Sequence, residues 1–476
     1  MPSQIRTNAT ILAHHLYDFA ECEHRIALDV SLERSRRTPP DEAMELLFEK
    51  GRQFERQIVE PLGYPTVELR EGDWEAAHAQ TIELMRAGVP GIDQGVLIDG
   101  GRLARPDLLE RVPGASTLGE HYYQPGDVKS ARTARSDAAL QVGFAALLLA
   151  KVQGRRPESG FLILGDGRRE EIDLEAIRYT IDDAVARAER IVGGEEETRP
   201  FYSVSCARCR WRGECVPRLQ EERDLSFVHG LTRSRNRVLR RHGVCTIDEL
   251  ATADVARLVE AGVPGDGLER AQAQARALVA GKASRVNAVK LPRGARRECY
   301  LRIEVNPLDD DQAMLLAWGE GAGGTIVDAQ ARVLSSAGER SGAWSELIGF
   351  LEATERREEP IYAFGSSTTR ALEAMADVEG LPTSRAGDAL GRIVDLAPWV
   401  RRAGVFPVFH YRFDEVAAVA VGSVRPSPAS PDDAAFVLHA ALGGADDASV
   451  RERLVAMGLD AVRSLFAIRM WLGRSS

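Results

Sequence analysis

The spacing of four cysteines constrains the fold of this chain more than any other feature. Cys22 stands alone near the start, and Cys206, Cys209 and Cys215 follow close together far downstream. Thiolates are soft ligands that suit zinc or iron–sulfur clusters. If the four sulfur atoms share one site, the ends of the segment between Cys22 and Cys215 must fold back onto each other, and that segment forms one structural unit.

Two kinds of metal site compete for this pattern. Structural zinc sites usually pair two Cys-x-x-Cys knuckles, whereas a cubane cluster takes four thiolates without a fixed spacing. The triplet supplies three ligands, and Cys22, in a helical context, is the nearest plausible fourth. The spacing therefore favours a 4Fe–4S cluster over a zinc site or unligated thiols. Cys245 and Cys299 are interpreted as buried thiols.

The length and charge of the chain narrow its class. A chain of 476 residues is too long for one hydrophobic core, so two or three domains are expected. The longest apolar run, 144–150, is too short to span a bilayer, and residues 1–6 lack the apolar segment of a signal peptide. We therefore expect a cytoplasmic protein with reduced cysteines and no membrane contact. A net charge of −10 argues against a protein coated in nucleic acid but permits a local basic channel.

Hydrophobic periodicity and turn residues predict three domains, 1–224, 225–285 and 286–476. The first is a mixed sheet flanked by helices, with helices at 41–60, 136–151 and 174–192, strands at 121–128 and 161–164, and a hairpin at 95–111. The second is short and helical. The third has strands at 299–305, 314–318, 324–327 and 361–364 and helices at 343–353, 368–376 and from 450 onward. The predicted fold class is therefore α/β.

A set of acids and one lysine in the first domain has the composition of a metal-dependent hydrolase site. Asp107 lies in the predicted hairpin, Asp127 lies on the next strand, and Lys129 projects from the same strand face as Asp127. Glu55 on the first helix can supply a third carboxylate, and the backbone carbonyl of Val128 a further oxygen ligand. Such oxygens hold Mg²⁺ or Mn²⁺, which activate water for phosphodiester hydrolysis. An ammonium group polarises the water or the phosphate.

Each of these residues also has an ordinary interpretation. A lone Asp-x-Lys is common on exposed strands, Asp107 could be a turn acid, and Glu55 could belong to a solvated helix face. Gln141, on the helix after Lys129, could be a surface amide, or it could orient water or a phosphate. The order of these residues inside the four-cysteine bracket is what favours a single site.

This order resembles the PD-(D/E)xK nuclease superfamily, and within it the RecB-like nucleases with an iron–sulfur cluster, of the CRISPR-associated exonuclease and AddB type. The matching residues, in chain order within about residues 8–217, are Cys22, Glu55, Asp107, Asp127, Lys129, Gln141, Cys206, Cys209 and Cys215. The resemblance implies a restriction-endonuclease-like fold, a 4Fe–4S cluster on the four cysteines, and catalysis by the matching acids, Lys129 and Gln141 with Mg²⁺ or Mn²⁺. One position departs, because the family has Gln-x-x-x-Tyr and this chain has Ala145 four residues after Gln141.

The other two domains carry weaker signals for nucleic acid. The segment 231–250 resembles a helix-hairpin-helix element, whose backbone amides bind DNA phosphates, and arginines outnumber acids between 206 and 242. A packing linker is the alternative interpretation. The last domain resembles the ribonuclease H-like, DEDD-exonuclease-type domain that follows RecB-like nucleases in one bacterial family. That family begins its domain with Asp-Ile-Glu, whereas here Arg302 replaces the Asp before Ile303 and Glu304.

The arginine at this position argues against activity of the last domain. Replacing a metal-binding carboxylate by a cation reverses the local charge, so we expect an inactive domain even if Asp395 and Asp460 occupy the later acidic positions. The combined expectation is a metal-dependent DNase that acts on ends or single strands in repair, recombination or phage defence. The main alternative is a non-catalytic nucleic-acid-binding scaffold built from decayed nuclease domains. A redox enzyme ranks last, because no Gly-x-Gly-x-x-Gly follows a strand.

Overall fold

The chain has a mixed α/β fold in two compact units, Met1–Pro200 and Phe201–Ser476. The computed structural model describes residues 11–70, 72–134, 136–292, 297–306, 309–353, 358–378, 389–422 and 447–473. The segment 1–6, expected to lack a signal peptide, lies outside the described residues. The division into three domains stays a prediction. Within the described parts, no helix combines the length and the apolar character that a bilayer span requires.

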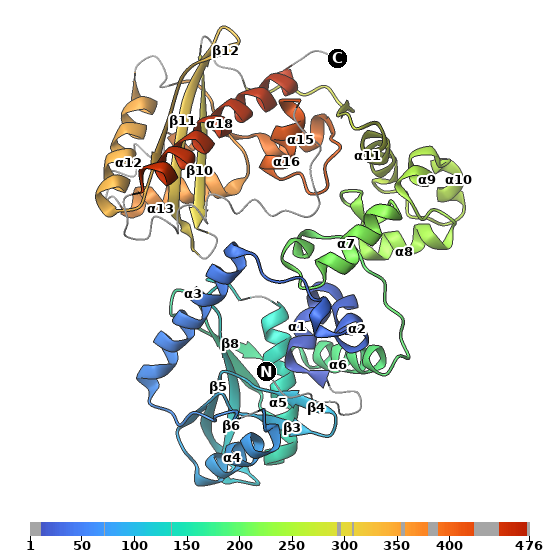
Figure 1. The fold of residues 1–476 in the computed structure, drawn as a ribbon, viewed down its shortest axis with the longest axis vertical. Coiled ribbons are helices and arrows are strands. Elements are labelled where there is room, and N and C mark those ends of the chain that lie inside the picture. The colour runs from blue at the N-terminus through green and yellow to red at the C-terminus, as the bar shows by residue number, and fades with distance from the viewer. Residues whose placement is uncertain are drawn as a thin grey trace. The chain divides into compact units, whose positions relative to one another are not determined.

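The first unit is built on a five-stranded mixed sheet with the order β2-β5-β6-β7-β8 (Figure 1). Its strands are β2 (Gly91–Asp93), β5 (Leu108–Ser116), β6 (Gly119–Val128), β7 (Ser159–Ile163) and β8 (Arg169–Asp173). Neighbouring strands are antiparallel except β6 and β7, which are parallel. A parallel pair needs a crossover connection, and helix α5 (Ser136–Gln153) provides it. Because α5 packs its apolar side chains against the sheet, it forms much of the core of this unit.

The predicted hairpin at 95–111 divides between two sheets. Strands β3 (Leu97–Asp99) and β4 (Arg102–Ala104) form a hairpin that pairs with β1 (Ile11–Leu12) in a small separate sheet. The chain then leaves this sheet and enters β5 of the larger one. Pro106 lies at the break and has no amide hydrogen to continue a ladder. The single-hairpin expectation was therefore wrong beyond residue 104.

The helices of the first unit are α1 (Ala13–Cys22), α2 (His24–Ser31), α3 (Glu42–Val59), α4 (Trp74–Ala87), α5 and α6 (Arg178–Val192). The three helices predicted in this unit correspond to α3, α5 and α6, whereas α2 and α4 were not predicted. Helix α3 begins where it does because the Asp41 carboxylate accepts the Met44 amide hydrogen at 3.0 Å. Helix α6 begins four residues later than predicted, because the Asp173 carboxylate holds the amides of Glu175 and Ala176 in a turn.

The second unit starts with a helical part. Its elements are η3 (Val204–Arg208), α7 (Arg212–Glu221), η4 (Leu225–Phe227), α8 (Arg233–Arg241), α9 (Ile247–Thr252), α10 (Val255–Glu260) and α11 (Leu268–Ala280). These elements share one apolar core, which includes Leu219, Phe227, Leu239 and Leu250. The prediction of short helices with turns near residues 243 and 262 is confirmed, since Gly243 and Gly262 both have positive φ.

A second five-stranded sheet follows, with the order β12-β11-β10-β13-β14. Its strands are β10 (Arg297–Asn306), β11 (Asp309–Ala322), β12 (Thr325–Val333), β13 (Ile361–Ala363) and β14 (Ile393–Asp395). Strands β10, β11 and β12 are antiparallel, whereas β13 and β14 run parallel to β10. The four strands expected in this region are confirmed, and β14 was missed.

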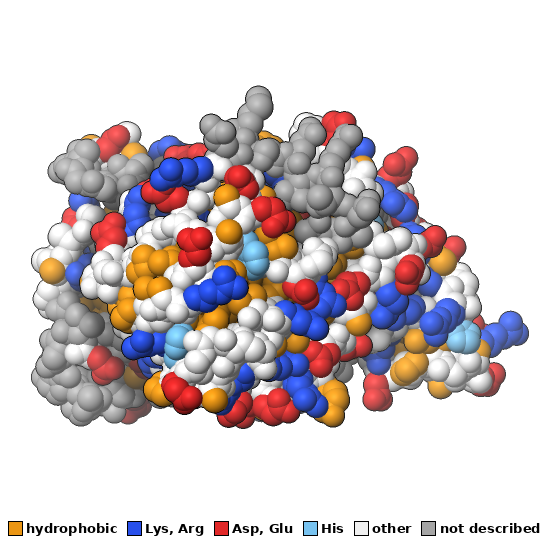
Figure 2. Space-filling model, turned by 90° about the horizontal axis from the view of Figure 1, so that it is seen from below, with side chains coloured by type: hydrophobic (Ala, Val, Ile, Leu, Met, Phe, Trp, Pro, Cys, Tyr) orange, Lys and Arg blue, Asp and Glu red, His pale blue; other side chains and the backbone are white. Residues whose placement is uncertain are grey.

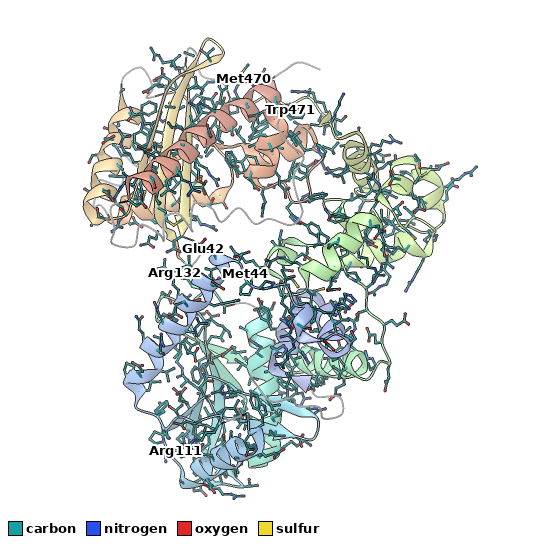
Figure 3. The ribbon with its side chains drawn as sticks, in the orientation of Figure 1. Glu42, Met44, Arg111, Arg132, Met470 and Trp471 are labelled. Atoms are coloured by element: carbon teal, nitrogen blue, oxygen red, sulfur yellow. The ribbon has the colours of Figure 1, made fainter. Side chains whose placement is uncertain are left out.

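Helices cover both faces of this sheet (Figure 1). They are α12 (Ala337–Glu352) and α13 (Ser366–Val378) on one face, and α15 (Leu396–Ala403), α16 (Phe413–Ala420) and α18 (Ala448–Gly473) on the other. Alternation along β10 separates the two cores, because Tyr300 packs with the α18 side and Leu301 with the α12 side. Trp471, near the end of α18 (Figure 3), packs on Phe406 with ring centroids 4.5 Å apart.

Candidate functional site

The register of β5 and β6 brings the two predicted aspartates together. Leu108 pairs with Gly126, so Asp107 and Asp127 occupy the next opposed positions, and the charge of Asp127 raises the pKa of Asp107. The Val128 amide donates to Asp107 Oδ2 at 2.8 Å, which fixes that carboxyl group against the neighbouring strand. The carbonyl of Val128 stays only a predicted metal ligand. Two acids that the sequence separates by many residues therefore share one end of the sheet.

Lys129 is the cation of this group. Its ammonium forms an ion pair with the Asp127 carboxylate, as expected for residues two apart on one strand face. Its backbone amide donates to the Ile163 carbonyl at 2.9 Å, which extends the β6–β7 ladder to this residue. Burial alone would lower the pKa of Lys129, but the charges of Asp127 and Asp107 outweigh it and raise that pKa. Lys129 is therefore an ammonium ion at neutral pH.

Glu55 reaches the site from α3 through a residue that the sequence analysis missed. Gln94 Nε2 donates to Glu55 Oε1 at 2.7 Å and to Asp107 Oδ1 at 3.2 Å. Burial raises the pKa of Glu55, and the nearby charges of Asp127 and Asp93 raise it further. No sequence pattern distinguished Gln94, because a glutamine between two short strands has many ordinary interpretations.

The charges of the site do not balance within the described residues. Burial raises the pKa of Asp107 well above its usual range, and the adjacent charge of Asp127 adds to this effect. Three carboxyl groups, from Glu55, Asp107 and Asp127, converge on one ammonium ion. A divalent cation would relieve the repulsion between them, and a set of carboxylate oxygens is the donor set that Mg²⁺ and Mn²⁺ prefer. The chemistry of these oxygens therefore suits such a cation, although no set of three oxygens, one from each of Glu55, Asp107 and Asp127, lies within 4.8 Å of one another.

Gln141 and Ala145 lie on α5 with different surroundings. The side-chain oxygen of Gln141 is buried and has no hydrogen-bond partner among the described residues. Asp137, one turn earlier on the same helix face, is close enough for its charge to raise the pKa of Lys129. Gln141 therefore faces the side of α5 that borders the acids. Ala145 is only 2% exposed and belongs to the apolar core, so this position of α5 is not at the surface of the site.

The four predicted cluster ligands belong to different compact units. Cys22 is buried at the end of α1 in the first unit, and Cys206, Cys209 and Cys215 lie in η3, after it, and in α7 of the second unit. Among the described residues, no three cysteine sulfur atoms lie within 4.8 Å of one another. Ligands of a cubane bind separate iron atoms, so a cluster does not require such close sulfur atoms.

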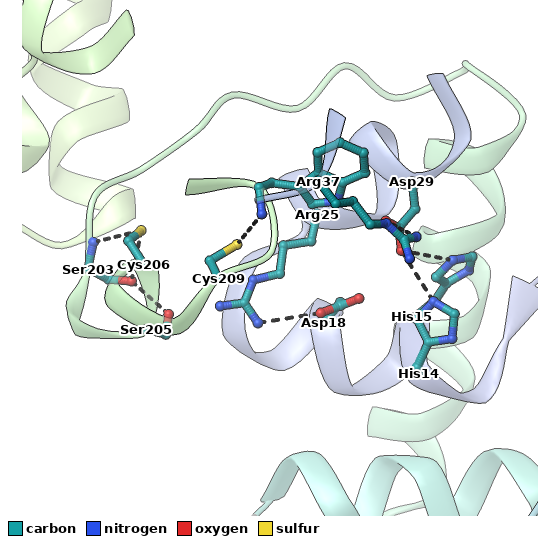
Figure 4. A network of polar contacts seen from close by, with 11 residues as sticks. His14, His15, Asp18, Arg25, Asp29, Arg37, Ser203, Ser205, Cys206 and Cys209 are labelled. Atoms are coloured by element: carbon teal, nitrogen blue, oxygen red, sulfur yellow. Dashed lines mark hydrogen bonds and ion pairs between the residues drawn. The ribbon is translucent and has the colours of Figure 1, made fainter. Parts of the chain in front are cut away.

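The local geometry of the triplet suits metal-bound thiolates. The Ser203 amide donates to Cys206 Sγ, and the Trp211 amide donates to Cys209 Sγ, each at 3.4 Å (Figure 4). Amide hydrogen bonds to sulfur stabilise the thiolate form and tune iron–sulfur clusters. Cys209 is buried as well, so both the donor set and the surroundings fit a cluster ligand.

A second cluster of polar side chains in the first unit contains three residues whose side chains are of the metal-binding type. Asp29 Oδ2 lies 3.2 Å from His14 Nε2 and 3.9 Å from His15 Nε2, and Arg37 forms an ion pair with the other Asp29 oxygen at 2.8 Å (Figure 4). The Leu12 amide donates to His15 Nδ1, so the neutral ring carries its proton on the nitrogen that faces Asp29. This arrangement suits hydrogen bonds between α1 and α2 better than a metal ion.

The acids predicted for the last domain all have partners. Arg302 donates to both carboxylate oxygens of Glu304, at 2.7 and 3.0 Å. Asp395 Oδ1 accepts the amides of Gly365 and Ala397, so it caps α15. Asp460 pairs with Arg463 on the exposed side of α18. These contacts use each carboxylate in the structure of the domain itself.

Neither a protein-family model nor a curated protein matches the sequence of this chain. The residues and their geometry are therefore the basis for any function assigned to this chain.

Proposed function

We propose that this chain is a metal-dependent nuclease that cleaves DNA, with a RecB-like PD-(D/E)xK catalytic domain. The observation that carries the proposal is the convergence of Glu55, Asp107, Asp127 and Lys129, which come from α3, the residue before β5 and the end of β6. Buried like charges are costly to bring together, so a site that gathers three acids beside one lysine indicates a functional role. The mixed sheet beneath them is compatible with the proposed fold.

Each residue has a role that its surroundings support. A divalent cation bound by Glu55, Asp107 and Asp127 would act as a Lewis acid on the phosphate and activate water. Lys129, which stays protonated, stabilises negative charge on the phosphate oxygens rather than acting as a base. The unpaired oxygen of Gln141 can accept a hydrogen bond from a water molecule.

The proposal also includes a 4Fe–4S cluster held by Cys22, Cys206, Cys209 and Cys215. The amide hydrogen bonds to Cys206 and Cys209 support thiolate ligands there. We expect protein purified without oxygen to be brown and to contain iron and sulfide. Cys209→Ser should lose the iron, and Cys245→Ser should keep it. A colourless wild-type protein that contains zinc would contradict the cluster.

The proposed partner is DNA, contacted in part by α8. Five of the nine residues of this helix are arginine, and none is acidic. Arg240 is paired with Asp224, whereas Arg237 and Arg241 are exposed and have no ion-pair partner in the described chain. On the face shown in Figure 2, basic side chains lie among acidic ones, so broad attraction of DNA is not expected there. A local arginine-rich helix suits phosphate contacts.

The direct test is cleavage by the full-length protein. We expect end-labelled single- or double-stranded DNA to be cut with Mn²⁺ or Mg²⁺ and to stay intact in EDTA. Asp127→Asn should abolish cleavage, and Asp166→Asn, which changes an exposed turn acid in the same unit, should not. Cleavage by the Asp127→Asn protein at the wild-type rate would overturn the assignment of the site.

The second candidate function is a non-catalytic nucleic-acid-binding scaffold. The Arg302–Glu304 pair in the ribonuclease H-like domain favours it, because a cation there takes the place of a metal-binding acid. Ala145 in the core of α5 favours it as well, since the aromatic residue of the family pattern is absent. DNA binding by the wild-type protein in Mn²⁺ without any cleavage would select this candidate.

A further inference from the structure

Gln94 is held in an unusual backbone conformation between β2 and β3. Its φ of 56° lies in the left-handed region, which residues other than glycine rarely adopt. Its amide donates to the Asp107 carbonyl at 2.9 Å, and its carbonyl accepts from Arg105 Nε at 3.5 Å. The backbone is therefore fixed against the start of β5. Strained residues of this kind persist where the surrounding contacts determine them, and they cluster at functional sites.

The side chain of Gln94 connects two acids from separate elements. Both partners, Glu55 on α3 and Asp107 beside β5, are carboxyl groups, so the amide nitrogen rather than the amide oxygen faces them. The nitrogen lies 2.7 Å from one carboxyl oxygen and 3.2 Å from the other. Two acids that would otherwise repel each other are thereby held together by one donor group.

A divalent cation that bridges Glu55 and Asp107 through their facing oxygens would lie where the Gln94 amide nitrogen now lies. Glu55 Oε1 and Asp107 Oδ1 are the oxygens that Gln94 engages, and they belong to the acids proposed above as metal ligands. The second oxygen of Asp107 is already engaged by the Val128 amide. A cation placed between Glu55 Oε1 and Asp107 Oδ1 must therefore displace the amide.

We propose that Gln94 is a positioning residue that bridges Glu55 and Asp107 in the metal-free protein and releases them when a divalent cation binds. The proposal rests on the metal site of the proposed function. It assigns two consequences to one side chain. Gln94 keeps the acids assembled before the metal arrives, and it lowers the apparent affinity for the metal, because the bridge must open first.

The test is the effect of Mn²⁺ on thermal unfolding of the full-length Gln94→Met protein. Methionine has a side chain of similar length and is also strained in the left-handed backbone conformation, but it has no hydrogen-bond donor. Without metal, this variant should unfold at a lower temperature than the wild type. In saturating Mn²⁺ the difference should disappear, and titration should show Mn²⁺ binding on the order of tenfold tighter, the scale of one lost hydrogen bond to a charged group.

Two variants make the result specific. Gln53→Met removes an exposed amide that bonds to Glu49 on α3, and it should leave both the metal-free stability and the Mn²⁺ shift as in the wild type. Asp127→Asn should abolish the Mn²⁺ shift, which locates the metal at this site. A Gln94→Met protein destabilised equally with and without Mn²⁺ would show a purely structural role and overturn the inference while leaving the metal site intact. A wild type that Mn²⁺ does not stabilise would overturn the inference and the metal site together.

Discussion

Each compact unit of this molecule has a group of acids near the ends of its strands, and the two groups differ in the partners of their carboxylates. In the first unit, the carboxyl groups of Glu55, Asp107 and Asp127 lie near one lysine, so negative charge is left in excess. In the second unit, Glu304 has a bidentate arginine partner of its own, and Asp395 is bonded to two backbone amides. Each of these two acids is therefore matched by donors of its own domain, whereas three carboxyl groups of the first unit lie near one lysine. The comparison indicates that a site is recognised by its unmet charge rather than by the presence of acids.

The largest expected effect comes from the cation of the first group. Lys129→Ala removes the ammonium that pairs with Asp127 and is proposed to stabilise the phosphate charge, so the nuclease rate should fall by about 10²–10³-fold. The rate of cleavage in Mn²⁺ is the measurement. Lys151→Ala, which changes an exposed lysine at the other end of α5, is the matched control. Equal cleavage rates for the Lys129→Ala and Lys151→Ala proteins would contradict the difference drawn between the two units.

The excess negative charge should also appear in the pH dependence of stability. Because the pKa of Asp107 is raised, the folded chain keeps this proton to higher pH than the unfolded chain does. The free energy of unfolding in EDTA should therefore fall as pH rises from the ordinary carboxyl pKa, about 3.9, to the raised pKa of Asp107. In the Asp107→Asn protein, the decrease in the free energy of unfolding should be smaller by about 1.4 kcal/mol for each pKa unit by which folding raises the pKa of Asp107. Urea denaturation at a series of pH values measures the free energy of unfolding. The same pH dependence in the wild type and the Asp107→Asn protein would contradict the prediction.

The arginine of the second group should act as a structural cation. Arg302 bonds to Glu304 and lies 4.5 Å above the ring of Phe413. Arg302→Met should lower the free energy of unfolding by about 1–3 kcal/mol, because a charged hydrogen-bond partner and a cation–π contact are lost. Arg463→Met, whose partner Asp460 is exposed, should change it by less than about 1 kcal/mol. Similar losses for both variants would weaken the distinction.

The smallest effect is expected for Glu304 in the second group. The same substitution at Glu55 in the first group provides the comparison. Glu304→Gln should change the nuclease rate by less than about twofold, whereas Glu55→Gln should lower it by at least about tenfold. Both variants keep side-chain volume and remove one charge. A loss of cleavage in the Glu304→Gln protein would mean that the second unit takes part in catalysis.

Local signals in the sequence predicted several of the longer elements. The apolar spacing after Asp41 placed α3 within one residue, and the strand predicted at 121–128 corresponds to β6. The division of the predicted hairpin was not visible, because β4 and β5 have the same local pattern and differ only in their partners. Pairing between strands that are distant in sequence depends on the whole core, which a local pattern does not describe.

The site was predictable to the extent that its residues share a strand. Asp127 and Lys129 are related by the two-residue period, and their ion pair follows from it. Gln94 was missed because its role depends on a left-handed backbone and on two acids that reach it from elsewhere. The position of Ala145 in the core could not be read from helix periodicity either, because α5 is buried on most of its circumference.

The half-buried ammonium of Lys129 has a practical consequence for chemical modification of the protein. An amine must lose its proton before it reacts with acylating reagents, and the raised pKa of Lys129 opposes that loss. The other four lysines, Lys50, Lys151, Lys282 and Lys290, are exposed. Amine-directed dyes or surface couplings will therefore attach at those four positions first, and the molecule can be labelled or immobilised through lysine while the charge beside Asp127 is kept.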